Sequence, residues 1–398
     1  MKYNLFNINN YSINTESFGH MLHGDVKYEF EEEFAKYVGA KYACTASSAS
    51  IIFYIAMKYF LNGVPEEKKN SHPIFIPSMI PAAIANIAHN LDYPTSWYDD
   101  VDWVGDSYVL YDTNPVMKCD GCPKKRAQTY PKIIDSAQKV EKNQFIKETD
   151  SPADVIVFSL YPTKPIGGMD GGIVVTNDEN AAAYFKSVTN LGFEEPRHEY
   201  PNKENASEVM PESLKKSLDE KEREIYGSVD PTSEVMELKK RIAELEQKGK
   251  SEKANGQKRS WEQELVFPGW KANANSAQCY VALENLKKLD EKNERLKKVQ
   301  EKYNNAFSLE NNSFHLYRID VKNRKEFIEK MNTEGLEIGI HYEPLHDKPF
   351  YEFSTPPNMH KTIKHGRTTV SIPFNETLED KDVDEIISKI NSTGLVIK

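Results

Sequence analysis

The stretch that decides the fold is VIVFSLYPTKPIGGMDGGIVVTN, residues 155–177. An apolar run ends in Ser159, Lys164 follows five residues later, and two glycine pairs lead into a second apolar run. Short apolar runs bounded by glycine and proline are typical of buried strands. The stretch therefore predicts two core strands joined by a loop that carries one lysine.

A second stretch, KIIDSAQKV (residues 132–140), places Asp135 at the end of another short β-branched run, with Gln138 just after it. A fixed amine can hold pyridoxal phosphate as a Schiff base, and a buried carboxylate can keep the pyridine nitrogen protonated. Lys164 and Asp135 are the candidates for these two roles. The ordinary alternatives are a solvated surface lysine and an aspartate that forms a turn at a strand end.

A phosphate site is predicted where TASSAS, residues 45–50, precedes the apolar run Ile51–Ala56. Hydroxyl and backbone N–H groups at a helix N-terminus bind phosphate, and the helix dipole adds to the attraction. The candidate ligands are Ser47, Ser48 and Ser159. The alternative is that the serines of TASSAS only cap the helix.

Taken in order along the chain, these segments resemble the DegT/DnrJ/EryC1/StrS family of sugar-nucleotide aminotransferases, a branch of the fold type I pyridoxal-phosphate enzymes. The resemblance runs from about Ser17 to the C-terminus. It is carried by segments that follow the family's order: HGDVKYEFEEEFAKYVGAKYACTASSAS, IPSMIPAAIANI, IIDSAQ, FSLYPTKPIGGMDGG, GWKANANSAQCYVALENLKKL, IGIHYEPLHDKPFY and TTVSIPFNETLEDKDVDEI.

This resemblance implies roles for the residues around the cofactor. Lys164 would be the Schiff-base lysine, Asp135 the partner of the pyridinium nitrogen, and Gln138 a contact on the oxygen side of the ring. The phosphate ligands that it implies are Ser47, Ser48 and Ser159.

The resemblance also implies roles for residues further along the chain. Lys271 and Asn273 would reach into the active site of a neighbouring subunit, which implies an obligate homodimer with shared sites. His341, Tyr342 and His346 fall where the family lines the entrance for the sugar nucleotide. A histidine at the end of an apolar strand can instead be merely structural.

Three departures from the family pattern stand out. Pro81 occupies the position where the family usually places an aromatic ring over the cofactor, so stacking must come from elsewhere. Ser47 and Ser48 replace a common glycine and threonine, which reduces backbone freedom but keeps two hydroxyls. The segment from Asp112 to Lys125 fits the family poorly.

Composition agrees with an ordinary globular enzyme. The 398 residues, 39% hydrophobic and 11% aromatic, are enough for a large domain and a smaller one. A net charge of −10 argues against a nucleic-acid partner, and no apolar run approaches membrane-spanning length. Four cysteines and an N-terminal MKYNLFNINNYSI without a signal-peptide core predict a cytoplasmic protein. The single CDGC at Cys119–Cys122 is interpreted as a surface turn, so no metal site is expected.

The alternation of elements predicts an α/β fold with a mostly parallel central sheet and helices on both faces. Strands are expected at about Ile74–Ile76, Tyr108–Tyr111, Ile133–Asp135, Val155–Leu160 and Ile173–Thr176. Cofactors bind at the carboxyl ends of such strands. Residues 1–282 would form the large domain and residues 283–398 a small α+β domain, with strands expected at Phe314–Val321 and Ile338–Tyr342 and a closing strand and helix at Thr369–Ile390.

One region departs from the family in length, at about residues 195–265. Pro211 opens a helical pattern that Gly227 ends, and a second pattern runs from Asp230 to about Gly249, which predicts a helical hairpin. The second helix carries a narrow apolar seam of Val235, Leu238, Ile242 and Leu245. The seam could pack within the hairpin, or form an oligomer contact or a lid.

The predicted function is that of a pyridoxal-phosphate aminotransferase that moves an amino group from an amino acid, glutamate by family inference, to a keto group on a nucleotide-linked deoxysugar. Such an enzyme would serve amino-sugar and glycan biosynthesis. The first alternative is a related sugar dehydratase, which has histidine at the lysine position, so Lys164 disfavours it. The second is a non-catalytic sensor or scaffold of the same fold.

Overall fold

The computed structural model describes residues 1–8, 13, 15–18, 21, 23–62, 69–70, 73–112, 131–193, 265, 268–356 and 358–397. The helical hairpin expected at about 195–265 lies outside these residues except for Leu265, and the CDGC segment lies outside them entirely. The fold described below belongs to the remaining part of the chain.

Five strands form the central sheet. They are β1 (Tyr42–Ala46), β4 (Tyr108–Asp112), β5 (Lys132–Asp135), β6 (Val155–Ser159) and β7 (Gly172–Thr176). Their order across the sheet is β1-β7-β6-β5-β4. β5 and β6 are parallel, whereas the pairs β1/β7, β6/β7 and β4/β5 are antiparallel. The carboxyl ends of β1, β5 and β6 therefore lie at one edge of the sheet. β4 and β7 run in the opposite direction.

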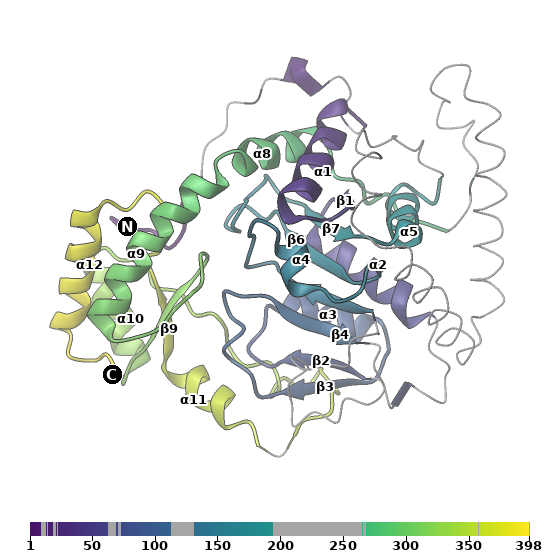
Figure 1. Ribbon diagram of the computed structural model, residues 1–398. Helices are drawn as coiled ribbons and strands as arrows, with labels where there is room; N and C mark the ends of the chain where they lie inside the picture. Colours follow the sequence, from purple (N-terminus) through teal and green to yellow (C-terminus); the bar gives the residue numbers. More distant parts are fainter. Residues whose placement is uncertain are drawn as a thin grey trace.

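A separate parallel pair extends the strand layer beside β4, as Figure 1 shows. It consists of β2 (Ile74–Pro77) and β3 (Thr95–Tyr98). Sequence reasoning did not predict β3, because its TSWY sequence is short and only partly apolar. Its central residue Trp97 is nevertheless buried, and it packs against Tyr351 and Phe353 from the C-terminal part of the chain.

Helices cover both faces of the sheet (Figure 1). One face packs on α1 (Asp25–Val38), α4 (Gln144–Glu148) and α8 (Ser276–Leu286). The other packs on α2 (Ala49–Leu61), α3 (Ala82–Asn90) and α5 (Glu179–Thr189). Successive residues of β6 point to opposite faces, so Ile156 and Phe158 join the first core and Val155 and Val157 the second. Burial on both faces explains why this strand is apolar throughout.

The C-terminal part has a third hydrophobic core of its own. Its elements are α9 (Leu289–Phe307), β8 (Tyr317–Asp320), α10 (Arg324–Thr333), α11 (His360–Thr368), β9 (Thr369–Ile372) and α12 (Asp380–Ser392). β8 and β9 are antiparallel. The first residues of the chain lie with this unit, because Tyr3 is in its core and forms a backbone bridge with Leu336. A short 3-10 helix, η1 (Thr15–Phe18), precedes α1.

The prediction of a strand at Ile338–Tyr342 is wrong. Only Gly339 pairs there, through two backbone hydrogen bonds with Ser371 of β9. The preceding Glu337 instead donates its backbone N–H to Tyr3. Because the backbone partners of this segment come from different parts of the chain, no ladder forms, and the apolar pattern reflects packing rather than strand pairing.

Candidate active site

Asp135 is the last residue of β5. Its side chain is 5% exposed, Oδ2 accepts a hydrogen bond of 2.9 Å from the Tyr108 hydroxyl, and Oδ1 accepts one of 2.9 Å from the backbone N–H of Ala137. Tyr108 lies directly opposite Asp135 in the β4/β5 register. Two donors leave part of the hydrogen-bonding capacity of the carboxylate unused, since a carboxylate has about four lone-pair sites.

Burial controls the charge of Asp135. Desolvation raises the pKa of this carboxyl to about 6, although the Ala137 N–H, the Tyr108 hydroxyl and the charge of Lys164 act in the opposite direction. The carboxylate is thus ionised near neutral pH but poorly solvated. A cationic partner would stabilise it strongly.

The loop between β6 and β7 carries Lys164. The backbone of Leu160 closes the loop by a 3.0 Å bond to Gly171 and a 2.7 Å bond from Gly168, and the Lys164 N–H donates to the Tyr161 carbonyl at 2.8 Å. The lysine side chain is partly buried. Burial lowers its pKa to about 8, against the opposing effect of the Asp135 charge. A substantial fraction of the amine is therefore neutral and nucleophilic at physiological pH.

The predicted phosphate loop leads into α2. Ser48 is the N-cap of this helix, and its Oγ accepts a 3.3 Å hydrogen bond from the Ile51 N–H. Ser47 precedes it at the carboxyl end of β1, and both serines are partly exposed. The capping alternative is thus realised for Ser48, in a position that also offers a helix N-terminus to an anion.

Ser159 lies at the same edge of the sheet. In the β1-β7-β6 ladder, Gly172 pairs with Ala46 on one side and with Ser159 on the other. Neighbouring strands are about 4.8 Å apart, so the end of β6 is about 10 Å from the end of β1. A Cβ at Gly172 would lie 2.5 Å from the Cα of Ala49, so only glycine lets β7 pass this close to the start of α2.

Gln138 connects three parts of the chain. Its Oε1 accepts a 2.8 Å bond from the Gly105 N–H, and its Nε2 donates to the Tyr342 hydroxyl at 2.9 Å. The side chain is 2% exposed. Gly105 has φ +91 and abuts Ser313, whose Oγ would be 2.2 Å from an added Cβ. The C-terminal unit therefore contacts the sheet-bearing unit beside Gln138.

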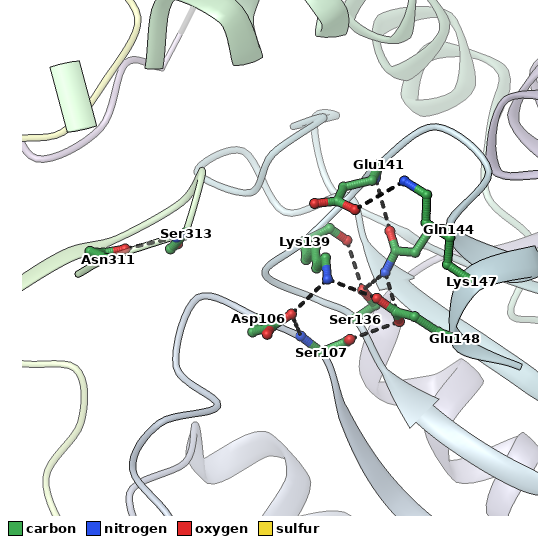
Figure 2. Close-up of polar contacts among 10 residues, drawn as sticks. All are labelled: Asp106, Ser107, Ser136, Lys139, Glu141, Gln144, Lys147, Glu148, Asn311 and Ser313. Atoms are coloured by element: carbon green, nitrogen blue, oxygen red, sulfur yellow. Dashed lines mark hydrogen bonds and ion pairs between the residues drawn. The ribbon is translucent and has the colours of Figure 1, made fainter. Parts of the chain in front are cut away.

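A polar network fixes the loop that follows Asp135, as Figure 2 shows. Lys139 forms 2.9 Å ion pairs with both Asp106 and Glu148. Gln144 donates to the Ser136 hydroxyl at 2.6 Å and to Glu148 at 3.1 Å. These contacts tie the loop to α4 and to the segment after Gly105, which limits the movement of Asp135 and Gln138.

The three candidate substrate residues of the C-terminal unit all have side-chain partners. His341 Nδ1 is 2.9 Å from the Ser371 hydroxyl, and His346 Nδ1 is 2.7 Å from the Ser78 hydroxyl. Burial, with the charges of Lys164 and Arg318, lowers the pKa of His341 to about 4. We call His341, Tyr342 and His346 the C-terminal group, and Asp135, Ser159 and Lys164 the strand-end group.

An aromatic face exists beside this site despite Pro81, which serves as the N-cap of α3. The Trp103 ring is parallel to the Tyr342 ring, with centroids 6.2 Å apart and an interplanar angle of 3°. It also contacts Tyr108 at 4.9 Å. Sequence reasoning missed Tyr108 and Trp103, because their relation to Asp135 and Tyr342 depends on strand register and on contact between the two units.

Lys271 and Asn273 lie beside the phosphate loop of their own chain. The carbonyl of Ala272, between them, accepts a 2.7 Å bond from the Ser47 N–H. The Lys271 side chain is exposed, and Asn273 donates to Asn190 at 3.4 Å. Their participation in a partner subunit's site stays a prediction.

Other kinds of site were also sought. Within the described ranges, no group of three or more His, Cys, Asp or Glu side chains could hold a metal ion. No helix in the same part of the chain is both long and apolar enough to cross a membrane.

Solved structures with a similar architecture include aminotransferases. Helicobacter pylori PseC, an aminotransferase involved in the biosynthesis of pseudoaminic acid, superposes with a TM-score of 0.63 at 17% identity over 98% of both chains. The aminotransferase TlmJ from Streptoalloteichus hindustanus gives a TM-score of 0.64 at 15% identity, also over 98% of both chains. The fold type I architecture expected from the sequence is thereby confirmed.

A sequence model of the DegT/DnrJ/EryC1/StrS aminotransferase family matches residues 7–103, 131–209 and 232–391. The chain belongs to this family, and it is a pyridoxal-phosphate-dependent aminotransferase by class.

Two named relatives match most of the chain. The spore coat polysaccharide biosynthesis protein SpsC of Bacillus subtilis (strain 168) is 22% identical over 409 residues, covering 94% of this chain and 90% of its own. A UDP-4-amino-4,6-dideoxy-N-acetyl-beta-L-altrosamine transaminase of Campylobacter jejuni is 21% identical over 386 residues, covering 89% and 86%.

The residues of the site fit pyridoxal phosphate. Asp135 is a buried carboxylate with unused acceptor capacity, which suits a protonated pyridine nitrogen. Lys164 is an amine with a lowered pKa on the neighbouring strand's loop. Ser48 stands at the start of a 13-residue helix, which suits the phosphate. This donor set matches the three polar ends of the cofactor.

Proposed function

We propose that this protein uses pyridoxal phosphate to transfer an amino group from an amino acid, glutamate in the first instance, to the keto group of a nucleotide-linked deoxysugar. One observation supports this above all: Asp135 ends β5, Lys164 lies in the loop after the neighbouring β6, and their pKa values are shifted toward each other, to about 6 and about 8. Burial is the largest cause of both shifts. Opposed shifts of this kind are typical of acid–base sites.

Lys164, Asp135 and Tyr108 would each have a different role in the reaction. Bound pyridoxal phosphate would supply an electron sink for the bonds around the donor's α-carbon. Lys164 Nζ would anchor the cofactor and, when free, carry the proton that leaves the α-carbon of the donor. Asp135 would hold a proton on the pyridine nitrogen, and the Tyr108 hydroxyl would keep its carboxylate in place.

Four further residues would bind and orient the cofactor. Ser47, Ser48 and Ser159 would hold the phosphate at the edge of the sheet, where the α2 N-terminus adds a favourable dipole. Gln138, fixed between Gly105 and Tyr342, would contact the oxygen side of the ring.

The substrate proposal draws on the relatives. One of them is named as a UDP-amino-sugar transaminase, and the C-terminal group provides polar side chains beside the site for such a substrate. We therefore infer an acceptor that carries a nucleoside diphosphate on a keto-deoxysugar, with His341, Tyr342 and His346 at its entrance. Low cysteine content supports a cytoplasmic location.

A homodimer with shared active sites is part of the proposal. Lys271 and Asn273 would contribute to the partner's cofactor site, and a closed two-fold dimer supplies this geometry twice. Two inactive variants, Lys164→Ala and the double change Lys271→Ala with Asn273→Ala, should restore activity when co-expressed, because a mixed dimer contains one complete site. Purified mixed dimers with no activity above either parent would refute the shared site.

The catalytic proposal is tested by spectroscopy in two steps. Protein loaded with pyridoxal phosphate should lose its visible absorption when glutamate is added, and regain it when a nucleotide-linked keto sugar accepts the amino group. Mass spectrometry of the sugar should then show replacement of the keto oxygen by an amine. A visible band that no amino acid bleaches would contradict the enzyme and favour a non-catalytic scaffold.

A further inference from the structure

A buried histidine of the C-terminal unit has no place in the roles above. His315 precedes β8 and is 5% exposed. Its ring stacks on Phe6, with centroids 5.1 Å apart and planes 21° apart, and the same Phe6 meets the edge of His341 at 6.0 Å. His341 in turn contacts Tyr342 at 5.1 Å. The Phe6 ring thus lies between His315 and His341 of the C-terminal group.

The position of His315 relative to the cofactor residues follows from its neighbours. The backbone N–H of His315 donates to the Ser313 hydroxyl at 2.9 Å. Ser313 abuts Gly105, whose backbone N–H donates to Gln138. The charge of Lys164 acts on both His315 and His341. The imidazole therefore lies on the side of the site where the C-terminal unit faces Lys164 and Gln138.

The imidazole of His315 has unused hydrogen-bonding capacity. Among the described residues, neither of its ring nitrogens has a hydrogen-bond partner, whereas His341 and His346 each use Nδ1 on a serine hydroxyl. Neither ring nitrogen is among the fully buried side-chain atoms that lack a partner, so the ring edge keeps some access although the residue is 5% exposed. An accessible ring edge without a protein partner is free to hydrogen-bond a ligand.

The charge state of His315 defines the kind of ligand. Burial, with the nearby charges of Lys164, His341 and Lys292, lowers its pKa well below the ordinary value. The ring is therefore neutral and has one donor and one acceptor nitrogen. A neutral ring can donate one hydrogen bond to a phosphate or a carboxylate, but it adds no charge attraction. It matches an uncharged hydroxyl or carbonyl oxygen.

We propose that His315 is a substrate-binding residue that hydrogen-bonds an uncharged oxygen of the sugar ring. The proposal rests on the proposed function, in that it assumes a nucleotide-sugar acceptor. The cofactor is a poorer candidate for this contact, because its polar ends are matched by Lys164, Asp135 and the serines of the sheet-bearing unit. The phosphate groups of the nucleotide would gain less from a neutral ring than from a charged side chain.

The test measures binding without turnover. Cofactor-loaded protein would be titrated calorimetrically with UDP-N-acetylglucosamine, GDP-mannose and dTDP-glucose, and with UDP, GDP and dTDP alone. The wild-type protein should bind one nucleotide sugar more tightly than the matching nucleotide. His315→Phe keeps an aromatic ring for Phe6 but removes both nitrogens, and should weaken binding of that nucleotide sugar about tenfold, as expected for one hydrogen bond with an unsatisfied partner.

Three comparisons make the result specific. His315→Phe should leave the Kd of the bare nucleotide and the visible spectrum of the cofactor unchanged, and His315→Asn, which keeps an amide, should recover part of the loss. His365→Phe is the control, since His365 lies in the same unit but pairs with Asp320 at 3.3 Å. It should bind the sugar as the wild type does.

Each remaining outcome overturns the inference. Equal binding by wild type and His315→Phe would show that the ring is only a packing partner of Phe6. Equal losses for nucleotide and nucleotide sugar would assign the effect to general damage. A wild-type protein that binds none of the nucleotide sugars better than the bare nucleotides would overturn the proposed function together with this contact.

Discussion

The strand-end group and the C-terminal group are held in different ways. The pairing of β5, β6 and β7 positions Asp135 and Ser159. A tight loop closed by backbone hydrogen bonds positions Lys164. His341, Tyr342 and His346 are each fixed by one side-chain bond to a distant residue. We therefore expect catalysis to depend on the sheet, and substrate recognition to depend on how the two units meet.

The strongest test of this comparison removes the amine of the strand-end group. Lys164→Ala should lower turnover by about four orders of magnitude or more, because the same nitrogen anchors the cofactor and moves the proton. Steady-state assays with glutamate and the keto sugar measure the effect. Lys147→Ala, an exposed lysine on α4, serves as the control and should keep wild-type turnover. Comparable turnover in the two variants would remove Lys164 from the mechanism.

The next largest effect is expected at Asp135. Asp135→Asn should retain the cofactor but slow the reaction with glutamate by about three orders of magnitude, because an unprotonated pyridine ring withdraws electrons poorly. Stopped-flow absorbance measures this step. Asp150→Asn changes a carboxylate that pairs with Lys132, at the opposite end of β5, and should have little effect. Near-native rates in Asp135→Asn would contradict the assignment.

A smaller effect concerns pH. Only the neutral amine of Lys164 would react with the cofactor, and burial lowers the pKa of this amine to about 8. The rate of cofactor attachment should therefore rise with pH and level off above about 8, whereas an ordinary lysine would still gain rate up to about 10.5. Since the Asp135 charge raises the pKa of Lys164, Asp135→Asn should move the midpoint to lower pH. A midpoint above 10 would show that the amine is not buried.

The smallest effect on activity is expected from the C-terminal group. The Ser78 hydroxyl accepts the backbone N–H groups of Leu345 and His346 at 3.1 Å each and also contacts the His346 ring. Ser78→Ala should cost about 1–3 kcal/mol in the free energy of unfolding, because two N–H groups lose their acceptor. Urea unfolding measures this loss, and turnover should change less than tenfold. An unchanged unfolding free energy would mean that water replaces the hydroxyl.

The strands that end in Asp135 and Ser159 were predicted from the sequence for a physical reason. The strands β5 and β6 are buried on both faces, so their apolar runs and the polar residues that end them are visible in the sequence. Fold class and family are confirmed by the comparisons. The residues of the C-terminal group were accessible only through the family resemblance, since no local pattern indicates that His346 meets Ser78.

Features that depend on long-range pairing were not predicted. Tyr108 faces Asp135 only because β4 runs antiparallel to β5, and the sequence does not show strand direction. The segment Ile338–Tyr342 looked like a strand, but its backbone partners are divided between the N-terminal residues and β9. His315 lies within the strand expected at Phe314–Val321, so no sequence pattern indicated a site residue there. Its contact with Phe6 is seen only in the structure.

The central claim is that Lys164 carries the cofactor above Asp135. The most direct measurement is to load the protein with pyridoxal phosphate, reduce it with borohydride, digest it and locate the modified peptide by mass spectrometry. The account predicts one modified residue, Lys164, with the modification lost in Lys164→Ala. A modification at another lysine, or none after the visible band has formed, would contradict it.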